Sequence, residues 1–248
     1  MQKEDLSRLY DALLFNVAFL LIIWVLWLYE LETGHALSQY GTRPRSVRGL
    51  IGIVSTPFLH GSLEHIRGNT LSFLSLSTFL IFFYREIAFK VIFWLYAISG
   101  VLLWIIANGG NHIGASGVIY GMAAFLFFSG IFRNDPRLLR VALAVAFLYG
   151  SIIWWVLPID PNISWEGHLA GSIVGVALAL IYRKRGPQRK VYNWELDEED
   201  EDYSHIPWNT NLQQAEDGVE TDEEDKKKGP DDSGPFQSNS SDGSGFSW

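Results

Sequence analysis

The chain of 248 residues contains no cysteine and only two methionines. The lack of cysteine excludes disulfide bonds, thiolate catalysis and metal sites with cysteine ligands. Charged side chains make up only 19% of the chain and are unevenly spread. Residues 193–248 hold 17 of the 27 acidic side chains but only 3 of the 19 basic ones, so residues 1–192 have a net charge of +6. The overall charge of −8 therefore describes the C-terminal part and not the rest.

Long apolar runs dominate the chain before residue 186. Apolar residues make up 48% of the sequence and aromatic residues 15%, with ten tryptophans. Six runs approach the ~20 residues that a helix needs to cross ~30 Å of hydrocarbon. They cover residues 12–31, 66–84, 88–107, 116–132, 138–157 and 168–182. We therefore predict an all-α, polytopic membrane protein whose residues 12–185 form a bundle of six transmembrane helices.

Basic side chains near the ends of these runs predict the orientation, because cytoplasmic connections are enriched in lysine and arginine. They precede the first run and follow the second, fourth and sixth, whereas the first connection is an exception with Arg43, Arg45 and Arg48. The majority predicts a protein of the cell membrane with residues 1–11 and the C-terminus in the cytoplasm. The long first connection is then extracytoplasmic, and its "LIGIVSTPFL" stretch is expected to form a structured element at the interface.

The composition changes near residue 186. Stretches such as "ELDEEDED" and "ETDEEDKKKGPDDSG" are acidic, polar and almost free of periodic apolar residues. A segment of this kind cannot bury enough apolar surface to fold alone. Residues 186–248 are therefore predicted to be a disordered, acidic, cytoplasmic tail.

The stretch "NHIGASGVIYGMAAF", residues 111–125, places Ser116 at the head of the fourth run. This run has only about 17 residues, or about 25 Å of helix, so its head should lie below the outer membrane surface. Irregular backbone at that depth is tolerated only beside protein or a water-filled cavity. The sequence thus predicts a hydrated pocket at Ser116. Taken alone, the motif also suits a plain helix start in which Ser116 is the N-cap.

The stretch "EGHLAGSIVG" places His168 at the same outer end of the sixth run. Glycines recur every four residues, at Gly167, Gly171 and Gly175 in this run and at Gly117 and Gly121 in the fourth. Such bare stripes allow two helix backbones to approach closely. If the two stripes meet, Ser116 and His168 lie at similar depth. Tyr120 then lies one turn from Ser116, where it can stack on the imidazole.

A third polar stretch, "HGSLEHIRGN", lies at the outer end of the second run and contains His60, His65 and Asn69. His65 and Asn69 are four residues apart, so both project from one helix face. Both side chains offer N–H donors, which a developing oxyanion needs together with a backbone N–H at Ser116. The three stretches supply a nucleophile, a base and oxyanion donors. Because Glu166 is the only acid near His168, we predict a Ser–His dyad without a carboxylate.

These motifs resemble those of the rhomboid intramembrane serine proteases. The matching stretches are "HGSLEHIRGN", "GASGVIYG" and "GHLAGSIVG", whose order and spacing agree over residues 10–183. The resemblance implies that Ser116 is the nucleophile, His168 the general base, His65 and Asn69 the oxyanion donors, and Tyr120 a stacking partner of His168. Supporting positions in the motifs are Gly114, Gly117, Gly171 and His60.

The resemblance further implies that the substrates are transmembrane proteins in the lipid bilayer. They are cut near the membrane boundary, usually after a small residue, and no cofactor or metal takes part. No nucleic-acid partner is expected. Two departures stand out: the first connection lacks a Trp-Arg pair that many members have, and Gly167 occupies a position where alanine is frequent.

Two other functions compete with this interpretation. A membrane metalloprotease could use His60, Glu64 and His65, although the H-x-x-x-E-H spacing differs from H-E-x-x-H and H-x-x-E-H. A non-catalytic relative could bind transmembrane helices or transport a solute, although the sequence contains no convincing internal repeat of the kind that transporters have. A minority of rhomboid relatives have lost the serine or the histidine, whereas this chain retains both.

Overall fold

The structure is a computed structural model that describes residues 3–160 and 163–189. Within these ranges the long helices are α1 (Lys3–Thr33), α3 (Leu63–Ile106), α4 (Ser116–Phe132), α5 (Pro136–Tyr149) and α6 (Trp165–Ile181). The described residues form no β-strand, only an isolated bridge between Thr42 and His112. The prediction of an all-α fold is therefore confirmed. Of the predicted tail, residues 190–248 lie outside the described residues.

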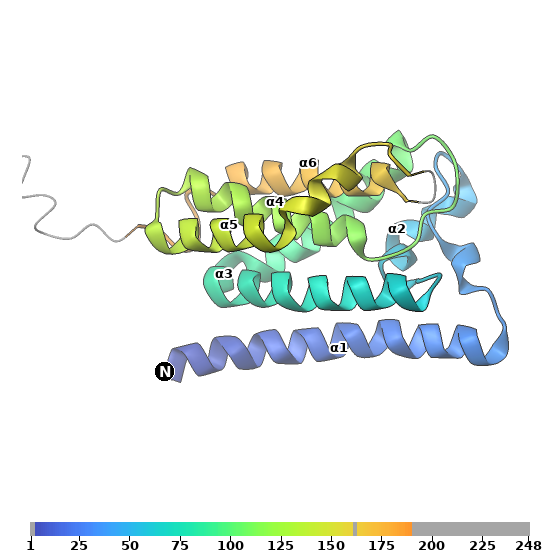
Figure 1. Cartoon of the computed structure of the whole chain (residues 1–248), viewed down its shortest axis with the longest axis horizontal. Coiled ribbons are helices and arrows are strands. Elements are labelled where there is room, and N and C mark those ends of the chain that lie inside the picture. The colour runs from blue at the N-terminus through green and yellow to red at the C-terminus, as the bar shows by residue number, and fades with distance from the viewer. Residues whose placement is uncertain (1–2, 161–162, 190–248) are drawn as a thin grey trace, which may run out of the picture. The chain divides into compact units, whose positions relative to one another are not determined.

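Helix α3 contains both the second and the third predicted run. Its 44 residues are interrupted at Tyr84, where φ is −122° and ψ is 30°, values outside the helical range. The chain turns back at this point, and the two arms of α3 run in opposite directions (Figure 1). Among the described helices, α1 and α3 are long and apolar enough to cross a membrane, while α4 and α6 are shorter apolar helices of 17 residues.

Three predicted boundaries were wrong. Helix α1 begins at Lys3, nine residues before the start of the first apolar run. The fifth run was predicted as one helix to residue 157, but α5 ends at Tyr149 and the 3₁₀ helix η4 (Gly150–Val156) follows. Gly150 weakens the α-helix and Pro158 cannot extend it, which favours a tight 3₁₀ ending. The sixth run was predicted to begin at His168, but helix α6 begins three residues earlier, at Trp165. Glu166 suits the first turn, because an acidic side chain interacts favourably with the positive end of the helix dipole.

The first connection is folded, as expected, and anchored. It contains η1 (Leu37–Tyr40), η2 (Val47–Leu50), α2 (Gly52–Ser55) and η3 (Thr56–Phe58). Trp104 Nε1 at the end of α3 donates to the Ser46 carbonyl at 3.0 Å, and Arg45 donates to the Ile105 carbonyl at 3.1 Å. A tryptophan of α3 and an arginine of the connection thus fix it in place, although it lacks a Trp-Arg pair of its own.

Helix α4 lies in the middle of the bundle and packs against α3, α5 and α6, while α1 lies outside against α3 (Figure 1). Its side chains Met122, Phe125 and Leu126 are fully buried. The outer surface is apolar: on α1, Leu13, Leu14 and Leu21 are each about 60% exposed. An apolar surface this extensive is typical of contact with lipid.

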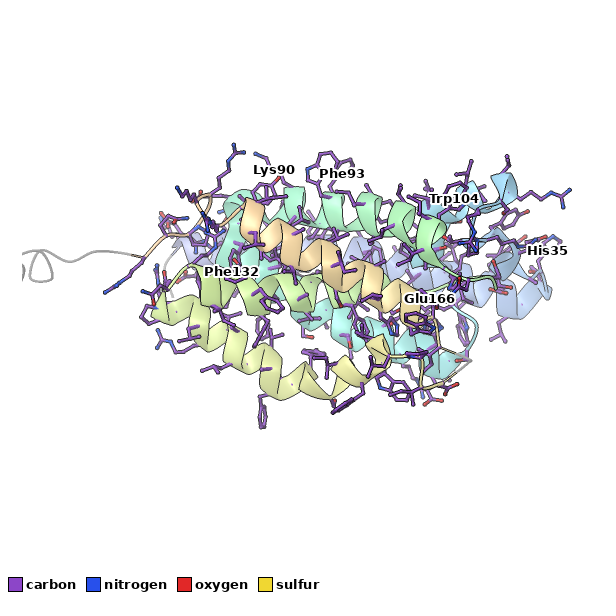
Figure 2. The ribbon with its side chains drawn as sticks, turned by 90° about the horizontal axis from the view of Figure 1, so that it is seen from above. His35, Lys90, Phe93, Trp104, Phe132 and Glu166 are labelled. Atoms are coloured by element: carbon purple, nitrogen blue, oxygen red, sulfur yellow. The ribbon has the colours of Figure 1, made fainter. Side chains whose placement is uncertain are left out.

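The bundle has two distinct ends. Figure 2 shows Lys90 and Phe132 at one end and His35 and Glu166 at the other. We call them the Phe132 end and the Glu166 end. The first connection and the three polar stretches of the sequence lie at the Glu166 end, and the short connection between α4 and α5 lies at the Phe132 end.

The closest packing in the bundle joins α4 to α6 through glycines. A Cβ atom on Gly171 would lie 1.9 Å from the Gly117 carbonyl oxygen, and one on Gly175 would lie 2.3 Å from the Gly121 oxygen. No side chain fits at these distances, so the two predicted glycine stripes do face each other. They hold the start of α4 directly against the start of α6.

At the Phe132 end, Arg133 joins three segments. It is 7% exposed and donates from Nε to Ser129 Oγ at 2.8 Å, from Nη2 to the Tyr182 carbonyl at 2.5 Å and from Nη1 to the Pro187 carbonyl at 2.7 Å. Its guanidinium also lies 5.4 Å from the centre of the Tyr84 ring. The kink of α3, the end of α4 and the end of α6 are therefore tied together.

Replacing Gly171 by alanine is expected to destabilise the bundle by at least ~2 kcal/mol, because the added methyl group overlaps the Gly117 carbonyl. Gly68, on an exposed face of α3, is the matched control, since a Cβ there meets nothing within 4 Å. Gly68→Ala should stabilise by about 0.5–1 kcal/mol through helix propensity. Thermal unfolding followed by tryptophan fluorescence measures both. Equal effects of the two variants would contradict close packing of α4 on α6.

Asp135 caps α5 and should make stability depend on acid pH. Hydrogen bonds from the Arg137 side chain, and from the Arg137 backbone N–H at 2.8 Å, lower the pKa of the Asp135 carboxyl below its ordinary value. A lowered pKa adds stability above about pH 4, which is lost as the pH falls through the folded-state pKa.

Asp135→Asn keeps a cap but does not titrate. We expect a loss of about 1 kcal/mol at pH 7 that shrinks toward zero below about pH 4. Asp11→Asn breaks an exposed pair with Arg85 and should cost less than about 0.5 kcal/mol. Unfolding curves recorded across this pH range test the difference, and a deficit of Asp135→Asn that does not change with pH would refute it.

Candidate active site

Ser116 is the first residue of α4, and its hydroxyl is not used as a cap. The N-cap is Ala115, which makes no side-chain cap hydrogen bond. The N-cap interpretation of Ser116 is therefore wrong. The hydroxyl makes no hydrogen bond to any of the described residues, and Ser116 borders a cavity of about 30 Å³ that is also lined by Thr42, Thr56 and His112. A cavity of this size with several polar groups in its lining can hold a water molecule.

His168 is held on two sides. Its Nδ1 lies 2.8 Å from the carbonyl oxygen of Trp155 in η4. Because a carbonyl can only accept, Nδ1 carries the proton and Nε2 keeps its lone pair. The ring of Tyr120 stacks on the imidazole with 3.9 Å between ring centres and 3° between planes. The ring orientation and the tautomer are thus both fixed.

Contacts of neighbouring residues place Ser116 and His168 in the same region of the structure. Tyr120, which stacks on His168, lies one turn after Ser116 on the same face of α4. A Cβ on Gly117 would lie 3.2 Å from the carbonyl oxygen of Gly167, so the residues that follow Ser116 and precede His168 touch. The first turns of α4 and α6 therefore meet at the Glu166 end with both polar side chains in the contact region.

His65 and Asn69 lie against the loop that leads into Ser116. A Cβ on Gly114 would be 2.5 Å from His65 Nε2 and 3.3 Å from Asn69 Nδ2. Gly114 also has φ = +107°, a conformation that only glycine adopts readily. Both donors therefore approach the backbone two residues before Ser116.

His60 positions Asn69. Asn69 Nδ2 lies 2.9 Å from His60 Nε2, within reach of an N–H donated to a neutral imidazole. Burial and the nearby His65 lower the pKa of His60 to about 4, so His60 is neutral at physiological pH. One amide N–H of Asn69 is held by this bond, and the other stays available on the side of Gly114.

The alternative of a metal site at His60, Glu64 and His65 has less support than a site built on Ser116 and His168. The described residues contain no group of three histidine or acidic side chains that could hold an ion. His60 and His65 are close, with 5.0 Å between ring centres, but Glu64 is exposed. One ring nitrogen of His60, Nε2, is engaged by Asn69. Glu166 likewise turns from His168 and approaches the Asn108 backbone N–H at 3.5 Å.

His112 is a central residue of this region that the sequence analysis did not single out. Its backbone exchanges two hydrogen bonds of 2.9 Å with Thr42, and its carbonyl accepts from Thr56 Oγ1 at 3.0 Å. Its Nε2 donates to the Gly109 carbonyl at 2.8 Å, which leaves Nδ1 to accept from Ser164 Oγ at 2.6 Å. His112 thus joins the first connection, the loop before Ser116 and the residue before α6.

Comparison with known proteins identifies the family. The family model described as the Rhomboid domain matches residues 47–185, more than half of the chain. The chain belongs to the rhomboid family. This family comprises intramembrane proteases and some inactive members. Its membership, together with the apolar helices, makes this rhomboid a membrane protein.

Three relatives show how far the similarity extends. Uncharacterized protein Rv1337 of Mycobacterium tuberculosis is 32% identical over 185 residues, covering 70% of this chain and 75% of the relative. Uncharacterized protein ML1171 of Mycobacterium leprae is 33% identical over 186 residues, covering 70% and 72%. Rhomboid-like protease 3 of Toxoplasma gondii is 29% identical over 138 residues, covering 53% and 51%.

The structure also explains why this rhomboid has Gly167 where alanine is frequent in the family. A Cβ on Gly167 would lie 2.9 Å from Ser164 Oγ, which is closer than side chains pack. Ser164 cannot easily move away, because its hydroxyl is bonded to His112. The glycine and the His112–Ser164 hydrogen bond therefore depend on each other.

This dependence predicts that the effect of Gly167→Ala on stability differs between the wild-type and the Ser164→Ala background. Gly167→Ala in the wild-type background should displace Ser164 Oγ and cost about 1 kcal/mol, as should Ser164→Ala alone. In the Ser164→Ala background the clash is gone, so Gly167→Ala should be neutral or slightly stabilising through helix propensity. Thermal unfolding of the four proteins measures this, and additive costs would refute the coupling.

Proposed function

We propose that this rhomboid is an intramembrane serine endopeptidase that cleaves transmembrane proteins near the extracytoplasmic membrane boundary. The observation that carries the proposal is the orientation of His168. Its Nδ1 proton is engaged by the Trp155 carbonyl, and its Nε2 lone pair is free in the region where the first turns of α4 and α6 meet. An imidazole prepared in this way is a general base for a hydroxyl beside it.

The proposed reaction uses Ser116 and His168 as a dyad. His168 Nε2 takes the hydroxyl proton of Ser116 as the oxygen attacks the scissile carbonyl. The Ser116 side chain rotates into line when substrate binds, since catalytic hydrogen bonds are often not formed in the free enzyme. The tetrahedral intermediate collapses to an acyl-enzyme, and His168 returns the proton to the leaving amine. Water then releases the acyl group by the same route in reverse.

The oxyanion is held by donors from two helices. The backbone N–H of Ser116 is at the start of α4, where the first N–H groups have no partner within the helix. His65 and the free amide N–H of Asn69 come from α3, and His60 holds Asn69 in place. The positive end of the α4 dipole adds to their effect.

The proposed placement in the membrane has six spans: α1, the two arms of α3, α4, α5 with η4, and α6. Both termini are cytoplasmic, so the Phe132 end with Arg133, Arg137 and Arg140 faces the cytoplasm. The Glu166 end then faces outward, which gives the dyad access to water. No metal or cofactor takes part.

The alternative is a non-catalytic rhomboid that binds transmembrane helices, since the family includes inactive members. A second alternative is metal-dependent cleavage through His60, Glu64 and His65. The first predicts no labelling by a serine-reactive fluorophosphonate probe. The second predicts activity that a chelator abolishes and zinc restores.

The dyad is tested by cleavage of a model transmembrane substrate in proteoliposomes, together with fluorophosphonate labelling. Ser116→Ala and His168→Ala should both abolish cleavage and labelling, because each removes a reacting group. Ser72→Ala and His35→Ala, in α3 and in the connection after α1, are controls and should leave cleavage unchanged. Cleavage by Ser116→Ala would refute the proposal.

Asn69→Ala should lower kcat by roughly 10²–10³ with little change in KM, because an oxyanion donor acts in the transition state. His60→Ala should lower kcat less, since it removes only the group that orients Asn69. Single-turnover cleavage measures both rates. An Asn69→Ala protein with wild-type kcat would remove Asn69 from the oxyanion site.

A further inference from the structure

A second cavity lies away from the candidate active site, between α3 and α5 at the Phe132 end. It has a volume of about 470 Å³ and is lined by Phe79, Phe83, Arg137, Arg140, Val141 and Ala144. We call it the Arg140 groove. Its floor is aromatic and aliphatic, and its two charged residues are both basic and both lie in the first turns of α5.

The two arginines differ in how they are engaged. Arg137 donates to the Asp135 carboxylate from Nε at 3.2 Å and from Nη2 at 2.8 Å, and to the Gln188 carbonyl at 3.3 Å. Arg140 is exposed, and within residues 3–160 and 163–189 its guanidinium has no hydrogen-bond or ion-pair partner. The lining contains two arginines and no acidic residue, and Arg137 pairs with Asp135, so Arg140 gives the mouth of the groove an excess of positive charge.

The residues of α5 that line the groove run from Arg137 to Ala144, which corresponds to about 10 Å of helix. An acyl chain that starts at Arg140 can lie along this apolar lining.

The apolar side chains of the lining suit an acyl chain, and the exposed guanidinium of Arg140 suits one phosphate group.

We propose that the Arg140 groove binds an anionic phospholipid, with an acyl chain against Phe79 and Phe83 and the phosphate on Arg140. The guanidinium forms charge-assisted hydrogen bonds to phosphate oxygens, and the excess positive charge at the mouth favours a lipid with net negative charge over a zwitterionic one. This site is distinct from the candidate active site. Its arginines lie in the first turns of α5, just after the Phe132 end, whereas His168 is two residues from Glu166 at the other end of the bundle (Figure 2).

The test uses the full-length chain and native mass spectrometry of retained lipid from an equimolar mixture of phosphatidylglycerol and phosphatidylcholine. Arg140→Gln should lower the preference for phosphatidylglycerol about fivefold, which corresponds to the ~1 kcal/mol of one basic residue near the surface. Arg48→Gln is the charge-matched control, since Arg48 is exposed on the first connection. An equal loss of the preference for phosphatidylglycerol in Arg140→Gln and Arg48→Gln would refute the proposed site.

The groove itself is tested without a change of charge. Ala144→Phe fills the lining and should reduce retention of both lipids, whereas Leu143→Phe, at a position outside the lining and 60% exposed, should not. Displacement of the lipid by millimolar inorganic phosphate would show a simple anion site and overturn the proposal.

The occupant is identified by placing a photoreactive diazirine amino acid at position 141, whose valine lines the groove. Cross-links to phospholipid in vesicles that contain phosphatidylglycerol support the proposal. Cross-links to residues 191–248 or to a second protein chain would replace the lipid by that occupant. These readouts measure no cleavage, so their failure leaves the proposed function untouched, and inactivity of the enzyme leaves the lipid site untouched.

Discussion

The backbone contact between α4 and α6 is the constraint on which the site depends. Gly117 and Gly121 on one helix face Gly171 and Gly175 on the other at distances that leave no room for a Cβ atom. In a bilayer, apolar side chains gain little by leaving lipid for protein, so close backbone packing carries more of the association than it does in water. The same contact sets the separation of Ser116 and His168. The stability of the bundle and the geometry of the candidate site therefore depend on the same backbone atoms.

The surroundings of His168 show how an imidazole can be oriented without a carboxylate. A buried acid inside a membrane protein is costly to ionise. Here the Trp155 carbonyl accepts the Nδ1 proton, and Tyr120 covers the ring face. A peptide carbonyl has a dipole but no net charge, so it fixes the tautomer with a small desolvation cost. It also stabilises an imidazolium less than a carboxylate would, so in the proposed reaction more of the catalytic demand falls on the oxyanion donors.

Much of this arrangement could be predicted from residue patterns. The bounds of α4 matched the fourth apolar run, because glycine-rich irregular sequence ends abruptly at Ser116 and the polar residues Arg133, Asn134 and Asp135 follow Phe132. The spacing of His65 and Asn69 placed them on one helix face. The glycine stripes predicted which helices touch, since a period of four residues is visible in the letters alone.

Other features of the candidate site could not be predicted, because they produce no recognisable pattern of residues in the sequence. The Trp155 carbonyl is a backbone atom in a 3₁₀ segment that an apolar run could not distinguish from α-helix. The His112–Ser164 hydrogen bond joins residues 52 positions apart, and neither belongs to a periodic motif. Gly167 was visible as a departure from the family, but its cause became clear only when Ser164 Oγ was found beside it.

The role of the Trp155 carbonyl has a consequence for genetics. A substitution at position 155 changes the side chain and leaves the oxygen that holds His168 in place. Alanine scanning would therefore record a tolerant position, and a comparison of related sequences would find no invariant letter there. The path of the chain through η4, and not the side chain at position 155, places the oxygen that orients His168. Only changes that alter this path, such as an insertion, a deletion or a proline, would reveal it.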